Sequence, residues 1–117
     1  MKNILVVDDD EGILEVVQLV LEMEGYYVQT SLDGSCFRQM PTDLPDLVLL
    51  DVLLSGEDGR AICQHLKASE RTKTIPVILF SAHADISATF KQCHADGFLK
   101  KPFALEALLA LVEKYIA

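Results

Sequence analysis

The sequence predicts an α/β fold in which five parallel strands form one sheet with helices on both faces. Short apolar runs alternate with longer stretches of helical periodicity, five times in succession. This alternation is typical of strand–helix units joined by right-handed crossovers. The 117 residues match one ordinary domain, and half of them are apolar, so a single core can form. We therefore interpret residues 1–117 as one domain.

The first half of the chain contains three of these strands. Ile4–Val7 is a continuous apolar run, as expected for a strand covered on both faces. Asp10 can cap the following helix and Gly25 can end it. The second strand is expected at Tyr26–Ser31 and the third at Asp46–Leu50, directly before Asp51. Inward positions of the first helix are Ile13, Val17, Val20 and Leu21.

The remaining elements follow from apolar spacing. A short helix is expected at residues 34–40, closed by Pro41, and the loop Ser55–Gly59 leads into another helix. Pro76–Phe80 and Gly97–Lys100 are the last two strands, separated by a helix that starts near Asp85. The inward positions of the later helices are Ile62 and Leu66, then Ile86, Phe90 and Cys93, and finally Leu105, Leu108, Leu109 and Val112.

Composition excludes several classes of function. Ten basic and eighteen acidic side chains give a net charge of −8, which argues against nucleic acid or an anionic membrane as a direct partner. Cys36, Cys63 and Cys93 are odd in number and widely spaced, so neither a disulfide framework nor a zinc site is predicted. The apolar stretch near the N-terminus is too short for a signal peptide or a membrane span. A cytoplasmic protein with reduced cysteines is expected.

Polar and charged residues gather where the predicted strands end. Asp8–Asp10 follow the first strand, Asp51 the third, Ser81 the fourth and Lys101 the fifth. In open parallel sheets, ligands bind beyond the carboxyl ends of the strands. If the first and third strands are neighbours, their aspartates converge there. Clustered carboxylates do not all stay ionised without a cation, because repulsion raises the pKa of at least one.

These residue types fit phosphoryl transfer. Mg²⁺ commonly binds one or two carboxylates together with water and phosphate oxygens. A lysine ammonium and a serine hydroxyl can each bind a phosphoryl oxygen. Taken singly, each aspartate is explained as well by a helix cap or a turn. The prediction therefore depends on the combination of Asp8, Asp9, Asp51, Ser81 and Lys101.

The sequence resembles the receiver domain of bacterial two-component response regulators over nearly its whole length. The motifs that carry the resemblance are Val6–Asp9, Leu49–Asp51, Asp58–Gly59, Phe80–Ala82 and Lys101–Phe103, in this order. The resemblance implies a flavodoxin-like sheet with strand order 2-1-3-4-5. It also implies a signalling switch that catalyses only its own phosphorylation and dephosphorylation, rather than an enzyme with a separate substrate.

The resemblance assigns a role to each motif. Asp51 would accept the phosphoryl group from a phosphohistidine. Asp9, Asp51 and the backbone carbonyl of Leu53 would bind Mg²⁺, with Asp8 acting mostly through a bound water. Lys101 would pair with Asp51 and then with the phosphoryl group. The switch residues would be Ser81, which turns toward a phosphoryl oxygen, and Phe98, which follows it inward, and the bond before Pro102 would be cis.

The resemblance also implies partners. The phosphodonor would be a sensor histidine kinase or a histidine phosphotransfer domain. A downstream protein would read the face built by the fourth helix, the fifth strand and the last helix, through which a homodimer could also form. Ser55 replaces the proline usual in the family, which affects the rigidity of its loop. Leu53 and His83 occupy positions that control water access, and an apolar Leu53 predicts slow dephosphorylation.

Two alternatives stay open on sequence alone. Asp8–Asp10 also satisfies the Asp-x-Asp motif of haloacid-dehalogenase phosphatases, although Glu11–Gly12 does not continue that motif. The second alternative is a receiver that acts purely as a docking module without phosphorylation. The histidines His65, His83 and His94 lack a paired spacing and are interpreted as surface residues.

Overall fold

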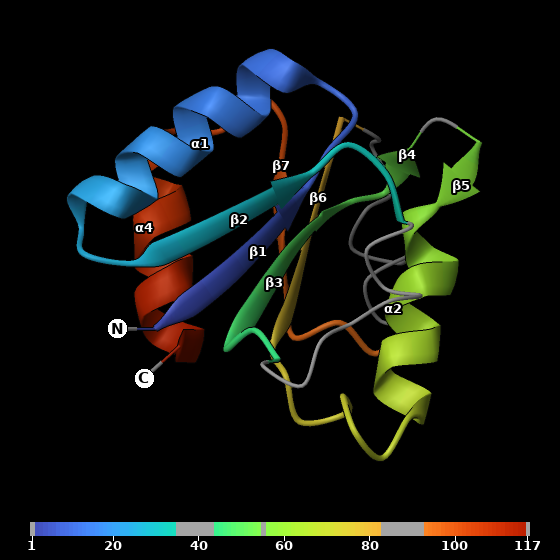
Figure 1. Cartoon of the computed structure of the whole chain (residues 1–117). Helices are drawn as coiled ribbons and strands as arrows, with labels where there is room; N and C mark the ends of the chain where they lie inside the picture. The colour runs from blue at the N-terminus through green and yellow to red at the C-terminus, as the bar shows by residue number, and fades with distance from the viewer. Residues whose placement is uncertain (1, 35–43, 55, 83–92, 117) are drawn as a thin grey trace.

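The computed structural model describes residues 2–34, 44–54, 56–82 and 93–116, and Figure 1 labels its helices and strands. Each predicted strand is present with bounds that differ from the prediction by at most one residue. The elements in chain order are β1 (Asn3–Val7), α1 (Glu11–Met23), β2 (Tyr27–Ser31), β3 (Leu47–Asp51), β4 (Leu53–Leu54), β5 (Glu57–Asp58), α2 (Gly59–Ala68), β6 (Val77–Ser81), β7 (Gly97–Lys100) and α4 (Leu105–Ile116).

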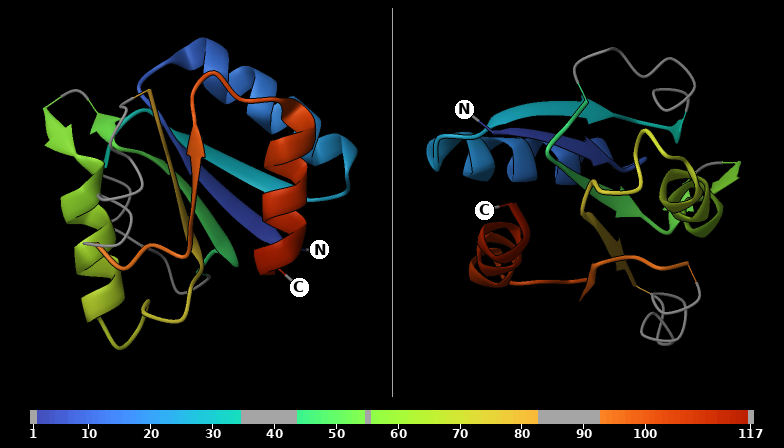
Figure 2. Two further views of the ribbon diagram at one scale, coloured as in Figure 1. Left: turned by 180° about the vertical axis from the view of Figure 1, so that it is seen from behind. Right: turned by 90° about the horizontal axis from the view of Figure 1, so that it is seen from below.

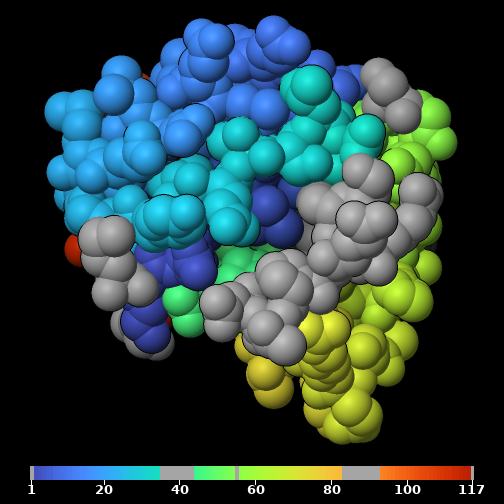
Figure 3. Space-filling view, viewed as in Figure 1, coloured from blue at the N-terminus to red at the C-terminus, as the bar shows by residue number. Residues whose placement is uncertain are grey.

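The main sheet has the order β2-β1-β3-β6-β7, and all of its pairings are parallel. β6 and β7 are its fourth and fifth strands in chain order, so the predicted order 2-1-3-4-5 is confirmed. The order reverses direction between β1 and β3, which is where parallel sheets place their ligand sites. The strands point toward the end of the molecule that carries β4 and β5 (Figure 1). β2 lies at one edge of the sheet and forms part of the outer surface (Figure 3).

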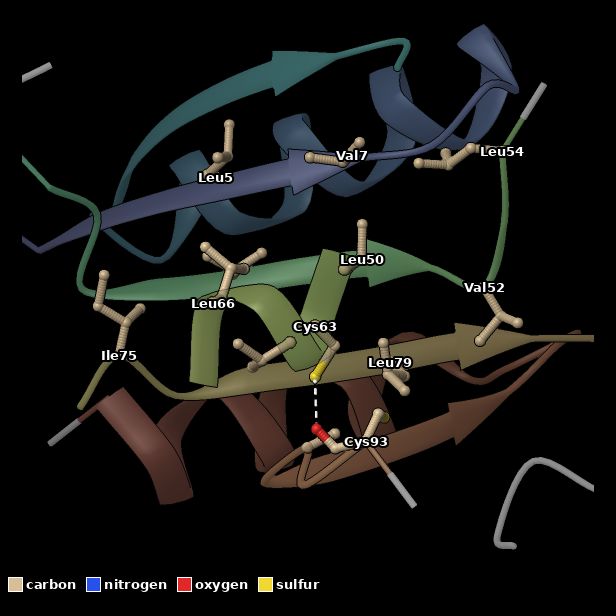
Figure 4. Packing of buried hydrophobic residues seen from close by; sticks show 13 residues of the cluster. Leu5, Val7, Leu50, Val52, Leu54, Cys63, Leu66, Ile75, Leu79 and Cys93 are labelled. Carbon is tan, nitrogen blue, oxygen red and sulfur yellow. Dashed lines mark hydrogen bonds between the residues drawn. The ribbon is translucent and has the colours of Figure 1, made fainter. Parts of the chain in front are cut away.

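Helices cover both faces of the sheet, as predicted. α1 and α4 lie on one side and α2 lies on the other (Figure 2). One buried cluster joins the sheet to α1 and α4, through residues such as Val17 and Leu108. A second cluster joins the opposite face to α2, through Cys63 and Leu66, and the Cys63 thiol donates to the Cys93 carbonyl at 3.4 Å (Figure 4). β1, β3 and β6 are buried on both faces, which explains their long apolar runs, whereas the edge strands β2 and β7 are only partly buried.

α1 begins and ends as predicted. The Asp10 side chain accepts hydrogen bonds from the backbone N–H groups of Gly12 and Ile13. Gly25 follows the helix with φ of +93°, a conformation that glycine adopts without strain. At the start of α1 the buried residue is Leu14, whereas the predicted inward residue, Ile13, is only half-buried. An Asp cap at one end and glycine at the other therefore fix the bounds of this helix.

The β4–β5 hairpin was missed by the sequence prediction, which expected only a loop at Ser55–Gly59. β4 pairs antiparallel with β5, with Leu53 opposite Asp58 and Leu54 opposite Glu57. Strands of two residues are too short to show an alternating pattern, so the sequence gives no signal for them. The helices predicted at 34–40 and from Asp85 onward fall mostly outside the described residues.

Candidate phosphoacceptor site

The parallel sheet brings aspartates from two strands to the same edge. Val7 pairs with Leu50 across β1 and β3, so Asp8 and Asp51, the next residues, lie side by side. Oxygen atoms of Asp8, Asp9 and Asp51 all lie within 4.8 Å of one another. The site thus joins the predicted carboxylates at the point where the strand order reverses.

The three carboxylates differ in their exposure to water. Asp8 has no accessible surface and Asp51 is 4% exposed, whereas Asp9 is an exposed residue. Buried charges are costly unless they are paired or bind a cation. The cluster therefore combines two buried carboxyl groups with one that faces solvent.

Lys101 supplies a positive charge inside the cluster. Its Nζ lies 2.8 Å from Asp8 Oδ2 and 3.4 Å from Asp51 Oδ2, and its side chain is 17% exposed. The shorter contact is with Asp8, and the pairing with Asp51 that the resemblance implies is also present. One ammonium group thus bridges two buried carboxyl groups.

Burial is the main cause of an unusual pKa at Asp51. Desolvation, followed by repulsion from Asp8, raises the pKa of Asp51 from 3.8 to about 6. Attraction to Lys101 and the hydrogen bond from the Leu53 N–H act in the opposite direction without cancelling the rise. The charge of Lys101 therefore does not offset the burial of Asp51 and its repulsion by Asp8.

Backbone groups fix the orientation of the two buried carboxyl groups. The Asp10 N–H donates to Asp8 Oδ1 at 2.9 Å, and the Leu53 N–H donates to Asp51 Oδ1 at 3.3 Å. Because each acid is held through one oxygen, its second oxygen is oriented toward Lys101. This leaves the carboxyl groups in defined positions before any ligand binds.

Gly59 is a positioning residue of the Asp-Gly motif. A Cβ atom at this position would lie 2.1 Å from the backbone oxygen of Asp51, so only glycine lets α2 start this close to Asp51. The Gly59 N–H also donates to the Val52 carbonyl at 2.8 Å. Its partner Asp58 caps α2 by accepting from the Arg60 N–H, and the hydrogen bond from the Arg60 side chain lowers the pKa of Asp58.

The predicted switch residues lie on β6 and β7, the two strands that follow β3 in the sheet order. Ser81 ends β6, is 1% exposed, and accepts a hydrogen bond at its carbonyl from the Lys101 N–H at 2.8 Å. Phe98 lies on β7 and is 37% exposed. The peptide bond between Lys101 and Pro102 is cis. Ser81 is thus tied through the backbone to the residue that carries the ammonium.

An apolar pocket of about 510 Å³ adjoins the cluster between α1 and the segment after β7. It extends from Asp10 and Lys101 toward Phe103, so one side of it borders the acidic site. Its apolar lining consists of Ile13, Val16, Val17, Ala82, Pro102, Phe103 and Leu105.

The other candidate residues of the sequence analysis are distributed as expected where the structure describes them. Cys93 is buried in the core, as predicted. His65 and His94 are exposed. His83 and Ser55 lie outside the described residues. Among the described residues, no helix is both long and apolar enough to cross a membrane.

Comparison with known proteins identifies the family. The family described as "Response regulator receiver domain" matches residues 4–113, and the chain belongs to it. Receiver domains of this family bind Mg²⁺ at an acidic pocket, and the present cluster of three aspartates corresponds to such a pocket. The phosphatase alternative has no support from this match.

The relatives include transcriptional regulators that are longer than this chain. The "DNA-binding dual master transcriptional regulator RpaA" of Synechocystis is 41% identical over 115 residues, which are 96% of this chain and 48% of that protein. The "Transcriptional regulatory protein CseB" of Streptomyces coelicolor is 38% identical over 113 residues, or 94% and 47%. The chain thus spans about half the length of these curated relatives.

Solved structures agree with this assignment. The signal receiver domain of a signal transduction histidine kinase from Syntrophus aciditrophicus has a TM-score of 0.91 and 32% identity, covering 99% of this chain and 90% of that one. The response regulator DrrB of Thermotoga maritima, an OmpR/PhoB homologue, has a TM-score of 0.87 and 34% identity, covering 99% and 52%. Similar receivers therefore occur both in kinases and in regulators.

Proposed function

We propose that residues 1–117 act as a single receiver that accepts a phosphoryl group on Asp51 from a phosphohistidine. The observation that carries the proposal is the buried Asp51 carboxyl group, flanked by Asp8, Asp9 and the Lys101 ammonium at the carboxyl edge of the sheet. The domain would thus be a switch whose state depends on phosphorylation of Asp51.

The chemistry requires a deprotonated acceptor. An oxygen of Asp51 attacks the phosphorus, the phosphorus–nitrogen bond to the imidazole breaks, and the released nitrogen takes up a proton in returning to neutral histidine. Because the pKa of Asp51 is about 6 without a cation, the ionised form predominates only above that pH. The Lys101 ammonium compensates the negative charge that the phosphoryl oxygens bring to the site.

Mg²⁺ would be held by Asp9, Asp51 and the backbone carbonyl of Leu53, with Asp8 acting mostly through a bound water. When bound, the ion neutralises the carboxylates and the incoming phosphoryl oxygens. The donor set fits, because it consists of oxygen ligands within 4.8 Å of one another with one solvent-facing member. Lys101 alone leaves an excess of negative charge, which also favours a divalent cation.

The signal would leave the site through Ser81 and Phe98. The Ser81 hydroxyl would bind a phosphoryl oxygen, and Phe98, now 37% exposed, would move inward behind it. The face that includes β7 and α4 would then change its affinity for a downstream protein or a second receiver. The cis bond before Pro102 joins Lys101 to the segment leading into α4, so the site and this face share one continuous stretch of chain.

The phosphodonor would be a sensor histidine kinase or a histidine phosphotransfer domain. The relatives named as transcriptional regulators support a downstream effector of gene expression, and the RpaA relative is named as DNA-binding. The net charge of −8 favours protein contacts over nucleic acid for the residues of this chain. Any DNA contact would thus belong to a further domain.

Mass spectrometry after incubation with Mg²⁺ and acetyl phosphate tests the proposal. Wild type is expected to gain one phosphoryl group that maps to the peptide containing Asp51, and Asp51→Asn is expected to gain none. Glu70→Gln is the matched control, because the Glu70 side chain is 88% exposed and pairs with Lys73, so this change should not alter labelling. Absence of labelling in wild type would favour the pure docking module, and labelling that persists in Asp51→Asn would exclude the proposed acceptor.

A further inference from the structure

The Lys101 ammonium contacts an aromatic ring as well as carboxylates. Its Nζ lies 5.0 Å from the centroid of the Phe80 ring, while its polar contacts are with Asp8 Oδ2 at 2.8 Å and Asp51 Oδ2 at 3.4 Å. An ammonium within about 6 Å of a ring centroid is attracted by the negative face of the ring. The ring thus lies against the one cation that the acidic cluster contains among the described residues.

The Phe80 ring itself is firmly held. It is 2% exposed, and its backbone pairs with Asp51 on one side and with Leu99 on the other. The Phe103 ring packs edge-on against it, with centroids 6.1 Å apart and planes at 77°. Aromatic pairs prefer this edge-to-face geometry. A buried ring on a strand that is paired on both sides, with Phe103 packed against it, is a suitable rigid support for a flexible side chain.

Lysine needs such a support because its four-carbon stem is flexible and its charge is a compact point. The two carboxyl groups define only one side of the ammonium. The face of the Phe80 ring adds a second side. The same strand continues directly into Ser81, whose carbonyl accepts the Lys101 N–H at 2.8 Å. Both ends of the lysine are therefore tied to β6.

We propose that Phe80 is a positioning residue for the phosphoacceptor site, and that the negative face of its ring holds the Lys101 ammonium in the gap between Asp8 and Asp51. The inference deepens the proposed function and rests on it. If the ring attraction were lost, Lys101 would occupy this position for a smaller fraction of the time. Phosphorylation of Asp51 would slow in proportion, by about 5- to 30-fold for complete loss of a largely desolvated cation–π contact.

Fluorinated phenylalanines separate the electrostatics of the ring from its shape. Replacing Phe80 by phenylalanines with one, two and three ring fluorines weakens the negative face stepwise with little change in volume. The logarithm of the rate of labelling by acetyl phosphate and Mg²⁺ should fall stepwise at position 80. The matched control is the same series in place of Tyr115, because the centroid of that ring lies 5.2 Å from the Lys114 ammonium on α4, and there the rate should stay constant. Thermal unfolding of each variant shows whether the fold is preserved.

The inference would be overturned if the labelling rate did not change with the number of fluorines at position 80, or if it fell equally at both positions. A ring with a purely structural role would respond to packing alone. A second measurement is independent of phosphorylation. In metal-free protein, the ring current of Phe80 should shift the Lys101 ε-CH₂ protons upfield in NMR spectra, and Phe80→Leu should abolish the shift. Unshifted protons in wild type contradict the placement. An upfield shift in a protein that cannot be labelled would instead leave the placement intact and refute the proposed function.

Discussion

The two ends of the central sheet each contain a partly buried lysine beside carboxyl groups, and the two clusters differ in their balance of charge. At the amino end, Lys67 binds Asp96 and the Ile75 carbonyl, and the Val77 N–H donates to the same Asp96 oxygen. At the carboxyl end, Lys101 lies between two buried carboxyl groups, with a third nearby.

The difference in charge balance favours the carboxyl end of the sheet as the ligand site. The cluster around Lys67 pairs one cation with one anion and adds backbone partners, so its charges balance where it connects α2 to the starts of β6 and β7. The cluster around Lys101 has excess negative charge, and the pKa of Asp51 rises to about 6 as a result of burial and of repulsion by Asp8. Charge balance, rather than the presence of a buried ion pair, therefore distinguishes a functional site from a structural one.

Removing each lysine should give the largest contrast. Lys101→Met leaves buried carboxyl groups without a cation and is expected to lower the free energy of unfolding at pH 7 by about 3–5 kcal/mol. Lys67→Met should cost about 1.5–3 kcal/mol, because Asp96 keeps its Val77 donor and is 35% exposed. Urea denaturation without divalent ions measures both losses. An equal or greater loss for Lys67→Met would contradict the distinction between the two ends.

The raised pKa of Asp51 predicts the next largest effect. The folded state binds the Asp51 proton more tightly than the unfolded state does, so metal-free protein should lose stability as the pH rises from 3.8 to about 6. A shift of this size corresponds to about 3 kcal/mol at 1.36 kcal/mol per pKa unit. Chemical denaturation across this range should show the slope in wild type and a much smaller one in Asp51→Asn. Identical slopes in the two proteins would show that Asp51 is not the perturbed group.

Mg²⁺ should stabilise the domain by binding to the carboxylates at the carboxyl end of the sheet. At ten times its dissociation constant, the ion is expected to raise the free energy of unfolding at pH 7.5 by about 1.4 kcal/mol. Lys67→Met should show the same gain, whereas Asp9→Asn should show less at the same concentration. Denaturation curves with NaCl at matched ionic strength provide the reference. A gain that survives in Asp9→Asn would place the ion elsewhere.

The smallest effect concerns the lifetime of the phosphorylated state. Leu53 is 53% exposed on the hairpin beside Asp51, so its apolar side chain can restrict the approach of water to the acyl phosphate. Leu53→Asn supplies a hydrogen-bonding group and should shorten the lifetime. The decay of labelled protein after removal of the donor measures it. An unchanged or longer lifetime in this variant would argue against a shielding role.

Much of this architecture could be predicted from the sequence, because strands buried on both faces are continuous apolar runs. The bounds were less certain, since Tyr26 and Asp46 are compatible with either a strand or a turn and lie just outside β2 and β3. The hairpin could not be predicted, because neither β4 nor β5 is long enough for a periodic pattern.

The sequence was enough to predict which residues form the site, but not how their side chains contact one another. Asp8 and Asp51 could be placed together once their strands were assumed to be neighbours, and β1 does pair with β3. The closer contact of Lys101 with Asp8 depends on side-chain geometry that no spacing reports. Phe80 was predicted as a strand residue and as the start of the Phe80–Ala82 motif. Its contact with the ammonium could not be predicted, because it joins residues from distant parts of the chain and has no local sequence signal.

Calorimetry of Mg²⁺ binding tests most directly whether the excess acid at the carboxyl end forms a cation site. Binding requires ionised carboxylates, so at pH 6 wild type should release a fraction of a proton for each ion bound, measured in buffers of different ionisation enthalpy. The release should vanish at pH 8 and be absent in Asp51→Asn. Undiminished Mg²⁺ binding by Asp51→Asn, or binding by wild type at pH 6 with no proton released, would contradict the account.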